Sequence, residues 1–240
     1  MFDNNSKIFF SVIIPTYNRA HLILNTLNSA LNQTFQSYEI IVIDDGSTDN
    51  TYEVIQQLNH CRIHYFKKEN AERGAARNFG MVRAKGDYIT FLDSDDFLYP
   101  DYLLKAYETI LKTGFPPFFH LGYEVRAFDG DLLFKANNVP SKEISFLIKG
   151  NNLSCMGVFI NKNLITDYLF SEDRDLAGSE DWELWMRITA RYGIIADNKI
   201  SACIIDHPQR SVFQISDKKL VTRKLLSLKY AFKDKRVQNK

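Results

Sequence analysis

The stretch "YEIIVIDDGSTDNTYEVIQQL", residues 38–58, decides the fold more directly than any other part of the chain. Its first half is an almost continuous run of apolar, β-branched side chains, which is typical of a strand buried on both faces of a parallel sheet. Turn residues follow and lead into a helix. A buried strand, a turn and a helix in this order predict one repeating unit of an α/β protein.

The same alternation runs through the first hundred residues. We expect strands over 8–15, 38–45, 62–66 and 87–93, and helices over 21–31, within 46–58 and over 74–84. Strands that alternate with helices at this rhythm predict a parallel sheet with right-handed crossovers.

After residue 96 the pattern becomes mixed. It predicts a helix over 102–111, a hairpin over 118–137 that turns at Asp129-Gly130, strands over 154–162 and 199–206, and a helix over 181–191. No linker, internal repeat or low-complexity tract divides the chain. We therefore predict an α/β, Rossmann-like three-layer fold in a single domain, 1–216. Residues 1–96 would form its nucleotide-binding half with a mostly parallel sheet, 97–216 its mixed back half, and 217–240 a basic helical tail.

Composition narrows the class of protein. The 240 residues are 45% hydrophobic and 25% charged, with a formal net charge of +1, which gives no case for disorder or for nucleic-acid binding. Cys61, Cys155 and Cys203 lie far apart with no C-x-x-C pair, which argues against a disulfide framework and suits a reducing cytosol. We see neither a signal peptide nor a membrane span, and we expect a cytoplasmic location.

Three polar motifs follow predicted strands, at 15–19, 44–47 and 93–96. In open α/β sheets, ligands bind outside the carboxyl ends of the strands, so the fold would bring these motifs to one rim. Asp44 and Asp45 are consistent with a plain turn, or with a carboxylate that accepts hydrogen bonds from a base or ribose.

Asp93-Ser94-Asp95 is a D-x-D motif, a pattern that chance readily supplies. Two further matches, 129–131 and 173–175, fall at a predicted hairpin tip and in a polar loop. Only Asp93 and Asp95 follow a buried strand, where hard oxygen ligands would suit Mg²⁺ or Mn²⁺ beside a diphosphate. The alternative is a polar turn that caps the next helix, a role that we assign to Asp96.

The segment "GSEDWELWMRI", 178–188, begins a helix with two acids. Glu180 and Asp181 would either stabilise the helix by interacting with the positive end of its macrodipole, or supply a general base. Other sites are absent from the sequence: no G-x-G-x-x-G follows the first strand and no P-loop motif occurs. His60 and His64 are spaced like zinc ligands, but Cys61 stands where H-E-x-x-H needs a glutamate.

Read in order, the motifs "SVIIPTYNR", "IVIDDGSTDNT", "ERGAARNFGMVRAKGDYITFLDSDD" and "GSEDWELWMRI" resemble the inverting nucleotide-sugar glycosyltransferases of family 2, with the GT-A fold. The resemblance covers about residues 9–191. It implies metal-dependent, inverting transfer of a sugar from a nucleotide-sugar donor, normally a UDP-sugar, to a glycan or lipid-linked acceptor, as in the synthesis of surface polysaccharides.

The resemblance also implies roles for individual residues. Those assigned to the nucleotide-sugar are Pro15, Thr16, Tyr17, Asp44, Asp45, Arg73, Asp93 and Ser94, with Arg77 and Asn78 as supports. Asp95 would be the principal ligand of Mg²⁺ or Mn²⁺, with Asp93 beside it. Asp181 would be the catalytic base, with Glu180 as the alternative. His207 would lie near the metal or the diphosphate, although Ile205-Asp206 replaces the Tyr-Arg that usually precedes it.

Two other classes share a nucleotide-binding α/β half: sugar-phosphate nucleotidyltransferases and catalytically inactive sugar-nucleotide binding modules. The former usually carry a Gly-rich loop after the first strand, and "PTYNRAH" is not one. The tail has nine Lys or Arg against two Asp. It is consistent with peripheral contact at the inner face of an anionic membrane, or with packing on the domain or on the partner of a homodimer.

Overall fold

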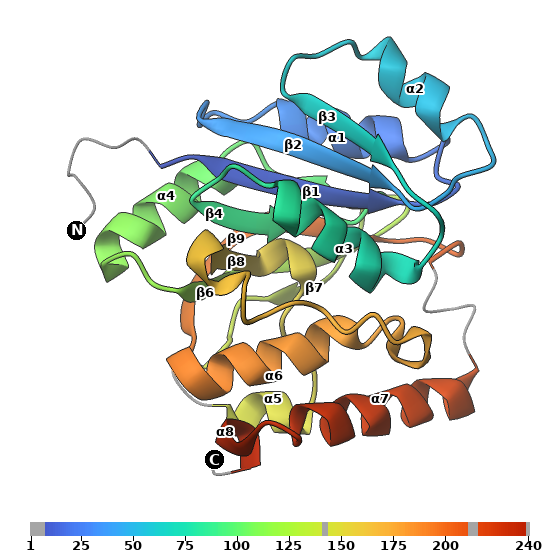
Figure 1. The fold of residues 1–240 in the computed structure, drawn as a ribbon. Helices are drawn as coiled ribbons and strands as arrows, with labels where there is room; N and C mark the ends of the chain where they lie inside the picture. Colours follow the sequence, from blue (N-terminus) through green and yellow to red (C-terminus); the bar gives the residue numbers. More distant parts are fainter. Residues whose placement is uncertain (1–7, 141–143, 211–215, 239–240) are drawn as a thin grey trace.

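The four strands expected in the first hundred residues lie side by side as the parallel part of the sheet. The structure, a computed structural model, describes residues 8–140, 144–210 and 216–238. Within these ranges nine strands form one sheet in the order β3-β2-β1-β4-β8-β6-β9-β5, with β7 paired to β6 (Figure 1). The strands are β1 (Phe10–Thr16), β2 (Tyr38–Asp44), β3 (Ile63–Lys67), β4 (Tyr88–Phe91), β5 (Phe97–Leu98), β6 (Phe118–Ala127), β7 (Leu132–Ala136), β8 (Val158–Asn161) and β9 (Ile195–Asp206).

Helices cover both faces of this sheet. They are α1 (Ile23–Leu31), α2 (Thr51–Gln57), α3 (Glu72–Arg83), α4 (Tyr102–Thr113), α5 (Ser145–Lys149), α6 (Glu180–Tyr192), α7 (Asp217–Ala231) and α8 (Lys235–Gln238). Short 3₁₀ turns occur at Cys155–Gly157, Lys162–Leu164 and Arg174–Leu176. Among the described residues, no helix has the length and apolar character needed to cross a bilayer.

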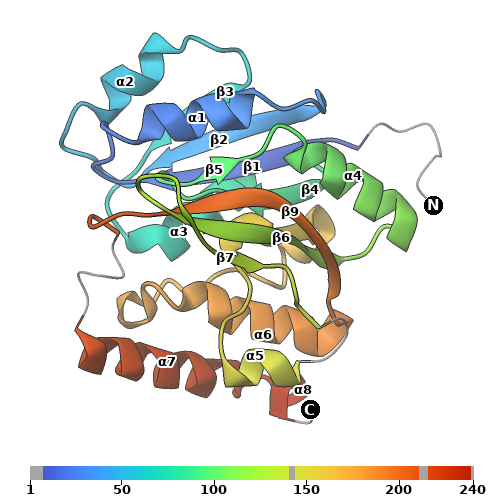
Figure 2. The ribbon, with the colours of Figure 1, turned by 180° about the vertical axis from the view of Figure 1, so that it is seen from behind.

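Successive residues of the central strands feed two separate cores. Val12 and Ile14 pack with α1 and α4 on one face, whereas Ile13 packs with α3 and α6 on the other. This alternation follows from the two-residue period of a strand. The result is three layers, with α1 and α4 in front of the sheet in Figure 2 and α3 behind it.

The register of the parallel strands aligns the ends that carry the polar motifs. β1 pairs with β2 from Phe10↔Tyr38 to Thr16↔Asp44, and with β4 from Phe10↔Tyr88 to Ile13↔Phe91. The residues that follow these strands therefore emerge at the same edge, as the sequence predicts.

The back half is mixed, which is also as predicted. β8 runs antiparallel to β4 and β6, whereas β9 runs parallel to β6 and antiparallel to β5. The hairpin of β6 and β7 turns at 127–131, where Gly130 has a φ of +97°. β9 begins at Ile195, four residues before the expected start, and α5 and β5 were not expected.

The C-terminal segment packs on the domain. α7 lies along the outer side of α6 (Figure 1), and Ser227 donates a hydrogen bond to the Ser179 carbonyl oxygen at 3.0 Å. Ala231 and Val237 are buried in the core that also contains Trp185 of α6.

Candidate functional site

A cavity of about 500 Å³ opens at the carboxyl edge of β1, β2 and β4. Three polar motifs supply much of its wall, together with the start of α3 and residues from the C-terminal part of the chain. Its lining residues are Pro15, Thr16, Tyr17, Asn18, Arg19, Asp45, Asn70, Glu72, Arg73, Ala76, Asp93, Ser94, Asp95, Gly178, Arg210 and Leu220. We call it the donor cavity, after the nucleotide-sugar donor that the sequence resemblance implies.

The first motif gives this cavity an aromatic and an apolar wall. Tyr17 is 46% exposed at the cavity, so its ring offers a face on which a planar base could stack. The buried Thr16 hydroxyl has no hydrogen-bond partner among the residues that the structure describes. Asn18 and Glu72 both have positive φ, at 50° and 71°, a strained conformation for residues other than glycine that is often found at functional sites.

The two aspartates of the second motif have different surroundings. Asp44 is fully buried and does not line the cavity. Its carboxylate accepts hydrogen bonds from the Ser47 backbone N–H at 2.7 Å and from the Tyr65 hydroxyl at 2.6 Å, so it shapes the turn. Asp45 lines the cavity and accepts from Lys68 at 2.6 Å and from the Ala71 N–H at 3.0 Å.

A glycine is required in the turn that follows Asp45. Gly46 has a φ of +88°, and a side chain there would lie 3.1 Å from the backbone nitrogen of Asn70. The turn is therefore held against the segment that leads into α3, which places Asp45 next to Asn70.

In the third motif Asp93, Ser94 and Asp95 line the donor cavity, whereas Asp96 is turned away from it. Our expectation that Asp96 caps the next helix is wrong. α4 begins at Tyr102 with Asp101 at its N-cap position, whereas the buried Asp96 carboxylate accepts a hydrogen bond from the Ile205 N–H at 3.1 Å. Asp96 thus ties the third motif to the end of β9.

This tie brings the C-terminal "DHPQR" segment to the D-x-D motif. His207 Nε2 lies 3.2 Å from Asp95 Oδ2, and Arg210 Nη1 lies 3.4 Å from Asp96 Oδ1. A carboxylate oxygen and an imidazole nitrogen are a donor pair that Mn²⁺ accepts, and carboxylates suit Mg²⁺. Within the described ranges, no group of three or more acidic, His or Cys side chains forms a complete metal site.

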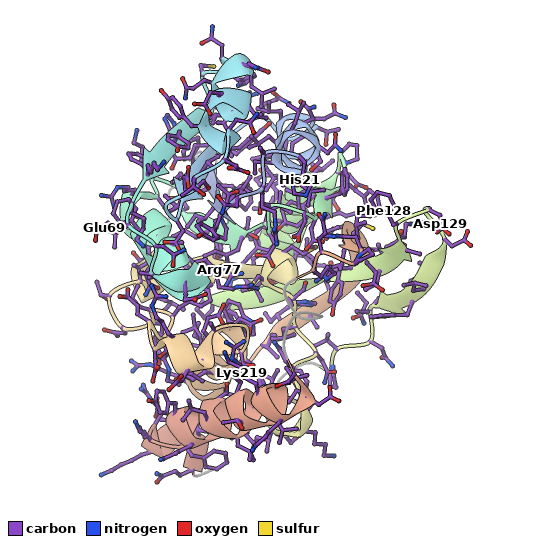
Figure 3. The ribbon with its side chains drawn as sticks, turned by 90° about the vertical axis from the view of Figure 1, so that its right-hand side faces the viewer. His21, Glu69, Arg77, Phe128, Asp129 and Lys219 are labelled. Atoms are coloured by element: carbon purple, nitrogen blue, oxygen red, sulfur yellow. The ribbon has the colours of Figure 1, made fainter. Side chains whose placement is uncertain are left out.

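Arg77 of α3 connects the third motif to the start of α6. Its guanidinium donates to Asp93 Oδ1 and to Glu180 Oε1, each at 2.7 Å, and it is 1% exposed. Burial alone would raise the pKa of Asp93, but the charges of Arg77 and Arg73 outweigh it and hold that pKa below its ordinary value. Glu180 also accepts from the Gly178 N–H at 2.5 Å, so both of its oxygens are engaged. In Figure 3, Arg77 lies near the middle of the molecule.

Asn78 has a comparable supporting position on α3. Its side chain donates to the Phe170 carbonyl oxygen at 3.0 Å and accepts from the Phe170 N–H at 2.9 Å. Close approach of this segment also requires Gly74, because a side chain there would lie 2.6 Å from the Ser171 carbonyl oxygen.

A second cavity, of about 380 Å³, adjoins the donor cavity. The two share Arg73, Asp93, Gly178 and Arg210 in their walls. The residues particular to the second are Arg77, Asp96, Tyr123, Asn151, Leu153, Ser154, Cys155, Met156, Glu180, Asp181 and Ile204. We call it the acceptor cavity, after the sugar acceptor that the sequence resemblance implies.

Asp181 lies in the wall of the acceptor cavity. Its Oδ2 accepts a hydrogen bond from Asn151 at 3.0 Å and lies 3.8 Å from the Cys155 sulfur, while Oδ1 accepts from the Trp182 N–H. Burial and the neighbouring Glu180 charge raise the pKa of Asp181 to about 6. A carboxylate with such a pKa is ionised near neutral pH and is a stronger proton acceptor than an ordinary aspartate.

The structure thus brings most of the predicted site residues together, and it adds residues that sequence reasoning did not assign. Arg210 lines both cavities, and Asn151 contacts the Asp181 carboxylate. Arg210 follows His207 by three positions in an element that the sequence already singles out. For Asn151 no motif offered a signal.

Comparison with solved structures identifies the fold class. The S. aureus TarS structure with UDP-GlcNAc aligns with a TM-score of 0.75 at 19% identity, covering 96% of this chain and 70% of that one. A mannosyltransferase from Pyrobaculum calidifontis, solved with GDP-Man and Mn²⁺, aligns at a TM-score of 0.69 and 17% identity, covering 97% and 66%. The chain has the GT-A fold of such glycosyltransferases.

Sequence comparison identifies the family. The model of glycosyl transferase family 2 matches residues 11–159. The glucosyltransferase WfgD of Escherichia coli is 31% identical over 194 residues, covering 80% of this chain and 72% of that protein. The teichuronic acid biosynthesis protein TuaG of Bacillus subtilis, described as putative, is 36% identical over 162 residues, covering 66% and 64%. The chain belongs to glycosyl transferase family 2.

Several relatives are longer than this chain. It spans 26% of the length of an uncharacterized glycosyltransferase of Rickettsia bellii and 63% of one of Haemophilus influenzae, at 34% and 36% identity.

Proposed function

We propose that the protein transfers a sugar from a nucleotide-sugar donor to a hydroxyl of a glycan or lipid-linked acceptor. The donor that we propose is a UDP-sugar. The reaction would invert the anomeric centre and serve the synthesis of a surface polysaccharide. One observation carries the proposal: two cavities meet at Asp93, and the carboxylate of Asp181, with its raised pKa, lies in the wall of the second.

The names of relatives support the choice of donor and acceptor. WfgD is named as a transferase from UDP-Glc to GlcNAc-diphosphoundecaprenol, and TarS was solved with UDP-GlcNAc. In this chain, Tyr17 would stack on the base, Asp45 would accept hydrogen bonds from it, and Arg73 and Arg210 would face the diphosphate. The acceptor hydroxyl would occupy the acceptor cavity.

Asp181 is our choice for the general base. It would take the proton from the acceptor hydroxyl, whose oxygen then attacks the anomeric carbon on the face opposite the leaving nucleotide. Glu180 is less suited to that role because its Oε1 is held in a buried ion pair by the Arg77 guanidinium, whereas the hydrogen bonds to the Asp181 carboxylate come from the neutral Asn151 side chain and Trp182 N–H. We assign Glu180 instead to positioning Arg77, and through it Asp93.

Asp95 and His207 would hold a divalent cation, Mg²⁺ or Mn²⁺, with Asp93 beside them. Their donor atoms are close together and of the types that these ions accept. The remaining ligands would come from the donor diphosphate and water. When bound, the cation would neutralise charge that develops on the leaving diphosphate.

A screen of nucleotide sugars with Mn²⁺ or Mg²⁺ tests the proposal. Release of the nucleoside diphosphate, slow with water and faster with a suitable acceptor, is the expected result. Release of pyrophosphate from a sugar phosphate and a nucleoside triphosphate would instead identify a nucleotidyltransferase. Tight donor binding without turnover, with every acceptor class tried, would identify a binding module.

The same screen tests the cation. Chelation with EDTA should abolish turnover, and added Mn²⁺ should restore it. Asp95→Ala should weaken Mn²⁺ binding in the presence of the nucleoside diphosphate, as measured by calorimetry. Asp131→Ala, in one of the other two D-x-D matches, is the matched control. Activity that survives both EDTA and Asp95→Ala would contradict the assignment of Asp95.

We also propose that α7 contacts the inner face of an anionic membrane, where lipid-linked acceptors would lie. Its solvent-facing side carries Val221 and Leu225, which are 56% and 62% exposed, beside Lys218, Lys224 and Lys229. Apolar side chains flanked by lysines are typical of helices that lie on anionic lipid.

Deleting 217–238 would be a poor test of membrane contact because this segment also completes the core. Changing Lys218, Lys224 and Lys229 to Glu should instead abolish flotation with vesicles that contain phosphatidylglycerol. The exposed Lys85, Lys112 and Lys162, changed in the same way, are the control. Equal flotation of the two triple variants would refute the proposal.

A further inference from the structure

The hairpin of β6 and β7 carries apolar side chains that the domain does not cover. Figure 3 shows its tip, marked by Phe128 and Asp129, projecting from the right-hand side of the molecule. Phe128 is 75% exposed, and Leu132, Leu133 and Phe134 are 46%, 51% and 53% exposed. Contiguous exposed apolar residues of this kind mark an interaction surface.

Both faces and one edge of β7 are open. Successive residues of a strand point to opposite faces, so the exposure of Leu133 together with its two neighbours shows that the described residues leave both faces largely open. Among the described strands β7 pairs only with β6, which leaves the backbone groups of its other edge without a strand partner. An edge of this kind is a template for another strand.

The sequence of β7 is complementary to itself. If two copies run antiparallel about a two-fold axis at Leu133, Asp131 of each copy lies opposite Lys135 of the other, and Leu132 lies opposite Phe134. Each pair then forms twice. Opposite charges and apolar side chains placed directly across two strands are favourable. Within the described ranges, neither Asp131 nor Lys135 forms a close ion pair, although Lys135 lies opposite Glu124 on β6 and its charge acts on that carboxylate.

Neighbouring registers lack this match. An axis at Leu132 would place Asp131 opposite Leu133, and an axis at Phe134 would place Leu133 opposite Lys135. Each register puts a charge against an apolar side chain. The pattern of charges therefore selects the register centred on Leu133.

We propose that β7 binds β7 of a second copy of this chain, antiparallel and centred on Leu133, so that two hairpins form one four-stranded ribbon. An anionic membrane suits this surface less well, because Asp129 and Asp131 at its tip would be repelled by the lipid charge. A single pair of short strands is a small interface, so we expect a reversible dimer with micromolar affinity.

Sedimentation of the full chain over a range of concentrations tests the proposal. The native protein should shift from monomer to dimer. Leu133→Lys sets two ammonium groups opposite each other at the axis and should raise the dissociation constant roughly tenfold or more. Leu225→Lys, at a similarly exposed position on α7, should leave the dissociation constant unchanged.

A charge exchange tests the register. Asp131→Lys should weaken the dimer, since it sets like charges opposite each other, and Asp131→Lys combined with Lys135→Asp should restore it. In a Cys61→Ser background, which removes the exposed native thiol, Leu133→Cys should form a disulfide-linked dimer on mild oxidation, and Leu225→Cys should not.

Three results would overturn the proposal. These are a native protein that stays monomeric at every concentration, a dimer that Leu133→Lys leaves intact, and a charge exchange that fails to restore association. Vesicle binding that is lost with Leu133→Lys in a monomeric protein would identify a lipid-binding hairpin instead.

Discussion

Asp181 owes its proposed reactivity to its neighbours. Because burial and the adjacent Glu180 charge raise its pKa to about 6, the folded protein holds this proton more tightly than the unfolded chain does. The ionised form is the base, so turnover should rise with pH as Asp181 loses its proton. The rate profile should have an acidic limb with an apparent pKa of about 6, measured as kcat/KM for the acceptor against pH, which reports the ionisation of the protein before the acceptor binds.

Removing this ionisation should affect activity and stability in opposite directions. Asp181→Asn should reduce transfer roughly 10²–10⁴-fold while donor binding persists. Between about pH 4 and pH 6 the unfolded chain releases this proton before the folded protein does, so the free energy of unfolding falls as pH rises through this range. At about pH 7 the variant should therefore be more stable than the native protein, by about 1–2 kcal/mol in urea unfolding. Asp167→Asn, at an exposed position, should change neither property. Full turnover by Asp181→Asn would disprove the role of base.

For single residues, the place of an acid relative to a buried strand was a better guide to the candidate site than the residue type. Three D-x-D matches look alike in the sequence, and Asp93 and Asp95 are set apart by following a buried strand. The sequence could not separate Asp44 from Asp45, because the hydroxyl that engages Asp44 belongs to Tyr65 on the next strand. It also misjudged Asp96, whose partner, the Ile205 N–H, lies 109 residues away. Contacts of this range leave no local pattern.

At the scale of elements, long amphipathic or buried segments were predictable and short ones were not. β1, β2 and β4 appear where their apolar runs fall. β5 has only two residues and exists through its pairing with β9, and α5 is a single short helix held by the Trp182 indole, which donates to the Leu147 carbonyl oxygen at 2.7 Å. Such elements depend on tertiary contacts, which outweigh local propensity.

The basic helix α7 is an element with two different sides. Ala231 on its inner side is fully buried, whereas Leu225 on its outer side is 62% exposed. Ala231→Asp should lower the free energy of unfolding by about 3 kcal/mol or more, because it buries a carboxylate without a partner. Leu225→Asp should change it by less than about 1 kcal/mol. Urea titrations of both variants make the comparison, and equal losses would show that α7 does not pack as described.

At the scale of the whole molecule, Arg77 joins the two halves. It bridges Asp93, at the end of the parallel strands, and Glu180, at the start of α6, so it also sets the relation between the two cavities. Arg77→Lys keeps the charge, but a single ammonium group cannot reach both carboxylates as the two terminal nitrogens of the guanidinium do. We expect a loss of about 3 kcal/mol in the free energy of unfolding, together with weaker donor binding, measured by urea titration and calorimetry.

The control for this variant is Arg191→Lys on the exposed side of α6. Reduced donor binding without a loss of stability in Arg77→Lys would show that Arg77 acts on the site alone. A loss of stability with donor binding unchanged would show that it acts on the core alone. The bridging role requires both.

One wall of the donor cavity has a consequence for the order of synthesis. Most of that cavity comes from the first hundred residues, but Leu220 of α7 also lines it. A chain emerging from the ribosome folds its N-terminal part first. The sheet edge with its three acidic and polar motifs would therefore form early, yet it would lack one side until residue 220 had left the exit tunnel. Full affinity for a donor would then be a property that the chain acquires only after α7 has been made and has packed against the domain.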